Sequence, residues 1–149
     1  MQNYYMALCV MESRFPISSE KEHVHTVTFT WYDAFKQNTK ASQQNIHLEK
    51  VVVVFNLAAI QSQITLFADR TTANGLKQAC NAFQAAAGAF ALLRDNISMK
   101  ASVGQSTLDV SIECASMIKR LMLTQAHECF FEKVIFNGKP NSHCSKVSR

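Results

Sequence analysis

The stretch GLKQACNAFQAAAGAFALLRDNI, residues 75–97, predicts a long helix at the centre of this chain. Large apolar side chains recur in it every seven residues, at Leu76, Phe83, Phe90 and Ile97. This is the spacing of one face of an α-helix. Alanines and Gly88 remove bulk from its other faces, so that neighbouring helix axes can approach closely. We therefore expect a core helix over residues 71–97, with further helices on two of its sides.

Apolar spacing also predicts helices over residues 2–14, 41–67 and 108–136. The second of these contains four successive valines, which would suit a buried strand, but a stretch this long without glycine or proline favours a helix. Thr71 or Thr72 can cap the central helix. The sequence thus indicates a mainly α fold of long, up-down helices.

One strand is expected over residues 24–31, where β-branched and aromatic residues alternate. A lone strand cannot satisfy its own backbone groups, so we expect it to pair with chain outside this sequence or with an irregular segment nearby. Ser106 and Asp109 resemble a capping box for the last helix, with Asp in place of Glu. The wide apolar band of that helix predicts two neighbours that bury it.

Composition excludes several classes of protein. With 48% hydrophobic and 17% charged residues, four glycines and two prolines, the chain is neither disordered nor a turn-rich β protein. No apolar run approaches the roughly 20 residues of a membrane span. Five cysteines without a CxxC pair predict free thiols in a reducing compartment. The charge of +4 is spread along the chain, which argues against a nucleic-acid partner.

Few patterns point to catalysis. His127 and Cys129 are zinc-ligand types, but two residues apart on a helix they point about 200° from each other and cannot share a metal. Glu128 and Glu132, one turn apart, are typical of a solvated face. The chain has no phosphate-binding loop, GxSxG or HExxH motif. We therefore expect no enzyme, metal, cofactor or small-molecule substrate.

Four blocks of sequence carry a family resemblance: TFTWYDAFK (28–36), HLEKVVVVFNLAA (47–59), GLKQACNAFQAAAGAFALLRDN (75–96) and LMLTQAHECFFEK (121–133). In this order and spacing they resemble the Bro-one domain of the ALIX family, and its plant members most closely. The resemblance implies a banana-shaped helical domain with tetratricopeptide-like hairpins and a small sheet. It also implies a cytoplasmic protein recruited to the membrane of endosomes and multivesicular bodies. The family's domain is much longer, so residues 1–149 resemble its middle portion, truncated at both ends.

The resemblance also implies a partner and its binding residues. In the family, a concave surface grips the C-terminal amphipathic helix of the filament-forming ESCRT-III subunit. Phe130 matches the first Phe of the family's QAxExFF motif on that surface, and ungapped extension adds His143 and Val147. Val147 keeps the aliphatic character of its position, whereas His143 does not, and an acidic position of the family falls on Ala73. From its helix alone, Phe130 would equally well be a core residue.

Two functions are therefore open. The first is a binding module for ESCRT-III in endosomal sorting, with Phe130 as an anchor. The alternative is a structural fragment or truncated isoform whose altered anchors no longer bind. An incomplete domain would also be poorly stable or would associate with itself, because apolar surface and backbone groups would stay exposed.

Overall fold

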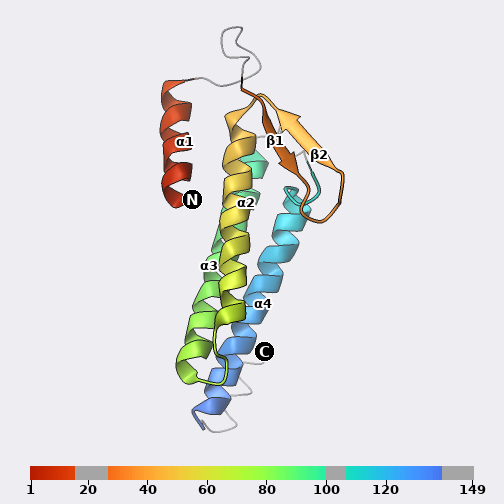
Figure 1. The fold of residues 1–149 in the computed structure, drawn as a ribbon. Coiled ribbons are helices and arrows are strands. Elements are labelled where there is room, and N and C mark those ends of the chain that lie inside the picture. The colour runs from red at the N-terminus through yellow and green to blue at the C-terminus, as the bar shows by residue number, and fades with distance from the viewer. Residues whose placement is uncertain (16–26, 100–106, 139–149) are drawn as a thin grey trace.

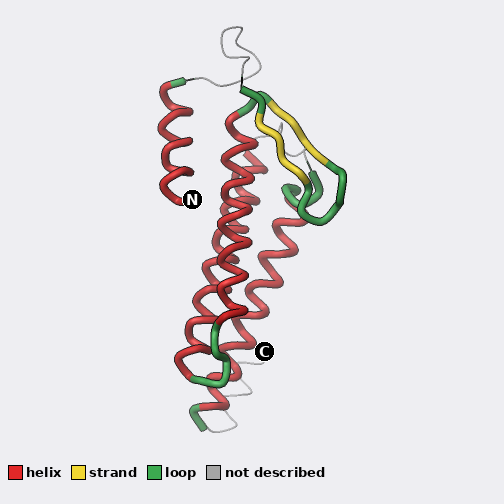
Figure 2. The backbone as a smooth tube through the Cα atoms, in the orientation of Figure 1, coloured by secondary structure: helices red, strands yellow, loops and turns green. Residues whose placement is uncertain are grey.

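The computed structural model of the chain describes residues 1–15, 27–99 and 107–138. Its elements are, in order, α1 (Gln2–Arg14), β1 (Phe29–Tyr32), β2 (Lys40–Gln43), α2 (Ile46–Ile64), the 3-10 turn η1 (Thr65–Phe67), α3 (Ala73–Met99) and α4 (Ile112–Phe136). The long helices α2, α3 and α4 run up and down beside one another, the hairpin lies over one end of this bundle, and α1 lies alongside α2 (Figure 1). Figure 2 shows that most of the described chain is helix and that strand is confined to one short hairpin. The predicted mainly α fold is confirmed.

The middle helix of the bundle is α3, which packs against both α2 and α4. Its seven-residue apolar face is buried, with Leu76, Phe83 and Phe90 each less than a tenth exposed. Ala79 and Ala86 are fully buried. Because alanine is small, the neighbouring backbones can approach α3 closely. The prediction of a core helix between two others is confirmed.

The four successive valines lie in α2, and all of them are buried. Successive residues of a helix point about 100° apart, so burial of Val51–Val54 requires other elements to pack on almost every side of α2. Contacts from α1, α3 and β1 meet this need. The segment Ile46–Phe67 is long and apolar enough to cross a membrane by length and composition, contrary to our expectation of no such run. Its valines, however, pack inside the protein.

Residues 41–43, predicted as helix, instead belong to β2, which pairs antiparallel with β1. Phe29 lies opposite Gln43, and Tyr32 lies opposite Lys40. Of the two partners expected for this strand, chain outside the sequence or a segment nearby, the nearby segment is the one observed. β1 also starts later than predicted, and residues 24–26 lie outside the described part. α2 begins after Asn45, whose side chain accepts a 2.9 Å hydrogen bond from the backbone N–H of His47.

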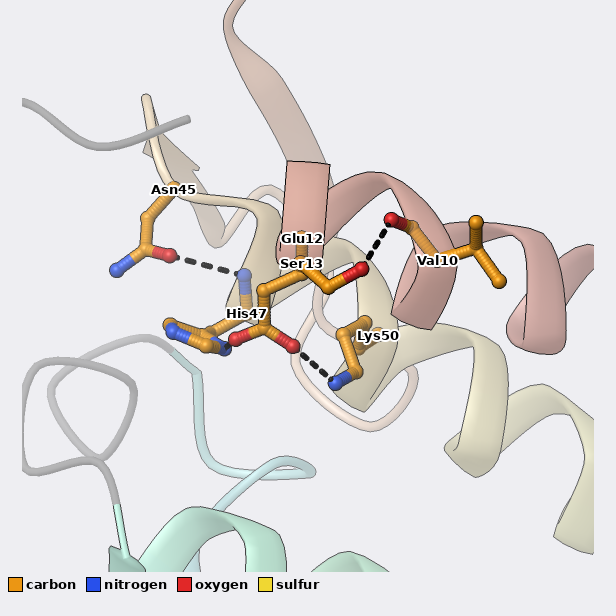
Figure 3. Close-up of polar contacts among 6 residues, drawn as sticks. All are labelled: Val10, Glu12, Ser13, Asn45, His47 and Lys50. Carbon is orange, nitrogen blue, oxygen red and sulfur yellow. Dashed lines mark hydrogen bonds and ion pairs between the residues drawn. The ribbon is translucent and has the colours of Figure 1, made fainter. Parts of the chain in front are cut away.

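α1 is held on α2 by an apolar and a polar group of contacts. The apolar cluster consists of Leu8, Ile46 and Val53. In the polar cluster, the Glu12 carboxylate lies between two side chains of α2, 3.2 Å from His47 Nδ1 and 2.7 Å from Lys50 Nζ (Figure 3). The predicted helix over residues 2–14 is confirmed, and both groups of contacts fix it against the first turns of α2.

Candidate partner-binding surface

The surface expected to bind a partner is carried by α4, which starts later than predicted. Ser111 is its N-cap, and the Ser111 hydroxyl accepts a 3.1 Å hydrogen bond from the backbone N–H of Cys114. The capping box predicted from Ser106 and Asp109 is wrong. Ser106 lies outside the described residues, and the Asp109 carboxylate bonds the hairpin instead.

One face of α4 is buried, and within the described residues α3 is the helix that packs along it. This face consists of Cys114, Ala115, Ile118, Met122, Ala126 and Cys129. The prediction that two neighbours bury the whole apolar band is wrong for the described part of the chain. More than a third of the surface of several apolar residues stays exposed: Met117, Leu121, Leu123, Phe130, Ile135 and Phe136.

Phe130 belongs to this exposed set. It is 46% exposed, whereas Cys129 beside it is completely buried. Leu123, seven residues earlier and 38% exposed, lies on the same side of the helix. Helical spacing places Lys119 and His127 on that side as well, and His127 is exposed. We call these four residues the Phe130 face: an apolar surface with basic neighbours, suited to an amphipathic helix that carries acidic residues.

Of the other positions that the family resemblance pointed to, the structure describes Ala73 alone. His143 and Val147 lie outside the described residues. Ala73, which occupies a position that is acidic in the family, is the first residue of α3 and is half-buried. The start of α3 and the end of α4 lie at the same end of the bundle (Figure 1).

Glu128 and Glu132 share a cation from the loop before α3. Arg70 Nη2 lies 3.0 Å from Glu132 Oε1 and 3.8 Å from Glu128 Oε2. Both glutamate side chains remain substantially exposed, so the prediction of a solvated face is confirmed. The arginine offsets the repulsion between the two carboxylates and ties the α2–α3 loop to the end of α4.

The buried thiol group of Cys129 offers little reactivity. Cys9, Cys80, Cys114 and Cys129 are free, and Cys144 lies outside the described residues. Burial raises the pKa of Cys129, which disfavours the reactive thiolate. No group of three or more metal-ligating side chains occurs within residues 1–15, 27–99 and 107–138.

A junction of two buried aspartates was not predicted. Trp31 Nε1 and the backbone N–H of Ala34 donate to Asp109 Oδ2 at 2.7 and 2.9 Å. Asp33 Oδ2 accepts a 2.8 Å hydrogen bond from the backbone N–H of Leu108. The two carboxylates therefore bind the hairpin to the start of α4. The one signal in the sequence was Trp31 itself, since a tryptophan that is half-buried needs an acceptor for its indole N–H.

The whole chain, residues 1–149, matches the sequence model of the BRO1-like domain. It is 58% identical over 148 residues to the vacuolar-sorting protein BRO1 of Arabidopsis thaliana, an alignment that covers 99% of this chain and 18% of that protein. It is 37% identical over 145 residues to ALG-2 interacting protein X of Dictyostelium discoideum, covering 97% and 18%. The solved ALIX BRO1 CHMP4C complex matches with a TM-score of 0.83 at 30% identity, over 97% of this chain and 41% of that chain. The chain thus spans about a fifth of the length of these two relatives.

Proposed function

The chain belongs to the BRO1-like domain family, and from this premise we propose that it is a protein-interaction module that binds the C-terminal amphipathic helix of an ESCRT-III subunit. A related domain is solved in the ALIX BRO1 CHMP4C complex, and CHMP4C is such a subunit. The Arabidopsis relative carries the name of a vacuolar-sorting protein. We therefore assign the chain to sorting at endosomes and multivesicular bodies, on the cytoplasmic side of their membrane, without a catalytic role.

The observation that carries this proposal is the exposure of Phe130 on the surface of α4. A phenylalanine that is 46% exposed leaves apolar area that a partner can remove from water. Such anchors supply most of the binding energy when an amphipathic helix lies in a groove. Lys119 and His127 add a basic border, which favours a partner helix with acidic residues beside its apolar face.

We extend this surface beyond α4 to Val147 and His143 on the strength of the sequence resemblance. Val147 supplies an aliphatic side chain of the kind that the family uses. His143 supplies a polar ring in its place, and Ala73 lacks the family's carboxylate. We expect both departures to weaken binding relative to other members of the family, because each removes a favourable contact.

The test is a direct binding measurement. A fluorescent synthetic peptide of the CHMP4C C-terminal helix is titrated with the 149-residue chain, and anisotropy is recorded. We expect saturable binding, and no binding by a matched peptide whose apolar-face residues are replaced by serine. A chain that melts cooperatively and still fails to bind would favour the alternative, a structural segment of a BRO1-like domain that does not bind this partner.

A further inference from the structure

An apolar pocket opens at the start of α4, on a different side of the helix from the Phe130 face. Its volume is about 470 Å³ and it is lined by Phe35, Leu108, Glu113, Cys114 and Met117. Three of these side chains are apolar and each about 60% exposed: Phe35, Leu108 and Met117. Met117 and Phe130 are separated by about 140° around the helix axis. The volume lies within the range of ligand pockets, roughly 300–1,000 Å³.

One exposed carboxylate lies at this pocket and two buried ones lie behind it. Glu113 is exposed at its rim, and the carboxylates of Asp33 and Asp109 lie behind its wall, where Asp33 bonds the backbone N–H of Leu108. The hydrogen bonds that Asp33 and Asp109 accept within the described ranges come from neutral N–H and O–H groups, and no salt bridge there involves either residue. The pKa of Cys114 is raised by burial and then by the charges of Asp109 and Asp33. Cys114 and Leu108 both line the pocket, so the two carboxylates lie directly behind its wall.

The apolar surface also continues past the pocket along α4. Leu121, one helical turn beyond Met117 and on the same side, is 52% exposed. A short apolar strip of this kind favours an elongated ligand over a compact one, and the exposed carboxylate of Glu113 at its start favours a cationic group on that ligand.

From this combination we propose that the pocket binds a basic peptide segment, which inserts one bulky apolar side chain between Phe35, Leu108 and Met117. Lysine or arginine side chains on either side of the inserted residue lie close to the exposed carboxylate of Glu113. Because this pocket and the Phe130 face lie on different sides of α4, the chain can hold two partners of opposite charge at once.

The proposal can be tested by nuclear magnetic resonance on the whole chain with isotope-labelled methionine methyl groups. The probe is a short synthetic peptide with a central leucine flanked by lysines. We expect a saturable shift of the Met117 methyl signal. The signal of Met122, which is only 9% exposed on the core side of the same helix, should stay in place. A matched peptide with glutamates instead of lysines should bind roughly tenfold more weakly, because its charge opposes that of the pocket.

Variants of the chain give a second test. Glu113→Lys should weaken binding of the lysine peptide about tenfold, and Met117→Ser should weaken it to a similar degree, about tenfold, by removing one wall of the pocket. Phe67→Ala is the matched control, since Phe67 is an exposed aromatic residue of η1, which follows α2 at the end of the bundle away from the start of α4 (Figure 1). Affinity of this control should not change. The proposal is overturned if Met117 shows no saturable shift, if both peptides bind equally, or if Glu113→Lys binds like the wild type.

Discussion

Trp31 Nε1 donates a 2.7 Å hydrogen bond to Oδ2 of Asp109, a completely buried carboxylate 78 residues further along the chain. The same oxygen accepts from the backbone N–H of Ala34 at 2.9 Å, and the Thr107 hydroxyl donates to the other oxygen. The indole ring also packs edge-on against Phe55, with 5.7 Å between ring centroids. Trp31 therefore connects the hairpin to α2 through its ring and to the start of α4 through its N–H group.

Replacing Asp109 should show how much this junction contributes to the stability of the fold. Asp109→Ala leaves one buried and two partly buried donors without an acceptor, and we expect it to lower the free energy of unfolding by roughly 3 kcal/mol. Asp109→Asn retains a carbonyl oxygen for Trp31 and Ala34, so it should cost less than half as much. Urea unfolding at neutral pH measures both. Equal losses for the two variants would mean that the charge, and not the acceptor geometry, stabilises the junction.

The sequence predicted the helices well because apolar spacing is a local signal, whereas the aspartate junction is not local. Asp109 follows Ser106 at the spacing of a capping box, and nothing nearby indicates that its acceptors serve Trp31. β2 was missed for a related reason. Its four residues, Lys40–Gln43, carry no apolar alternation, and pairing with β1 alone makes them a strand.

The candidate binding surface was only partly predictable. α4 has apolar residues nearly all round, so periodicity could not distinguish its buried side from its exposed side. Only the position of α3 shows that Cys129 is buried and Phe130 is not. The pocket at Phe35 and Met117 was beyond prediction, since its walls come from the hairpin loop and from α4.

The stability of the chain should fall in acid partly because of Asp33. Burial raises the pKa of this carboxyl, but hydrogen bonds from the backbone N–H groups of Phe35, Lys36, Leu108 and Asp109 outweigh burial and hold the pKa below its usual value. The contribution of Asp33 to stability is therefore complete above the unfolded pKa of about 3.9 and is lost as the pH falls through the lower folded value.

Asp33→Asn should test this pH dependence. The variant should be less stable than the wild type at neutral pH, and the difference should shrink on acidification below about pH 4. Denaturant unfolding at several pH values measures it, with Asp95→Asn on the exposed surface of α3 as the control. A difference between Asp33→Asn and wild type that stays constant with pH would refute this account.

The same substitution should have opposite effects at two glycines of α3. A Cβ on Gly75 would lie 1.8 Å from the carbonyl oxygen of Asp69, so Gly75→Ala must displace the backbone where Thr72 caps the helix. We expect a loss of about 2 kcal/mol. Gly88 lies in the helix interior with no heavy atom within 4 Å of such a Cβ, so Gly88→Ala should gain about 0.5–1 kcal/mol. Thermal unfolding should show a lower melting temperature for Gly75→Ala and a higher one for Gly88→Ala.

His143→Ile should tighten binding to the ESCRT-III helix. A polar ring in an apolar contact loses transfer free energy, and it loses more when protonated, so the gain should be largest near about pH 6. Titrations of the CHMP4C peptide across pH measure this gain, and Val147→Ser should act in the opposite direction by removing an aliphatic contact. If His143→Ile binds no more tightly at any pH, His143 lies outside the binding surface.

Phe130→Ala separates an interface anchor from a core residue. As an anchor, Phe130 should contribute roughly 2 kcal/mol to binding of the ESCRT-III helix, so the variant should lose about thirtyfold in affinity. Because the residue is 46% exposed, the melting temperature should change little. A core phenylalanine would instead cost about 3–5 kcal/mol of stability. Phe67→Ala, in which the truncated ring is 89% exposed and belongs to η1 and not to α4, is the matched control for both measurements. A large drop in melting temperature for Phe130→Ala but not for Phe67→Ala, with the affinity of the folded fraction unchanged, would assign Phe130 to the core.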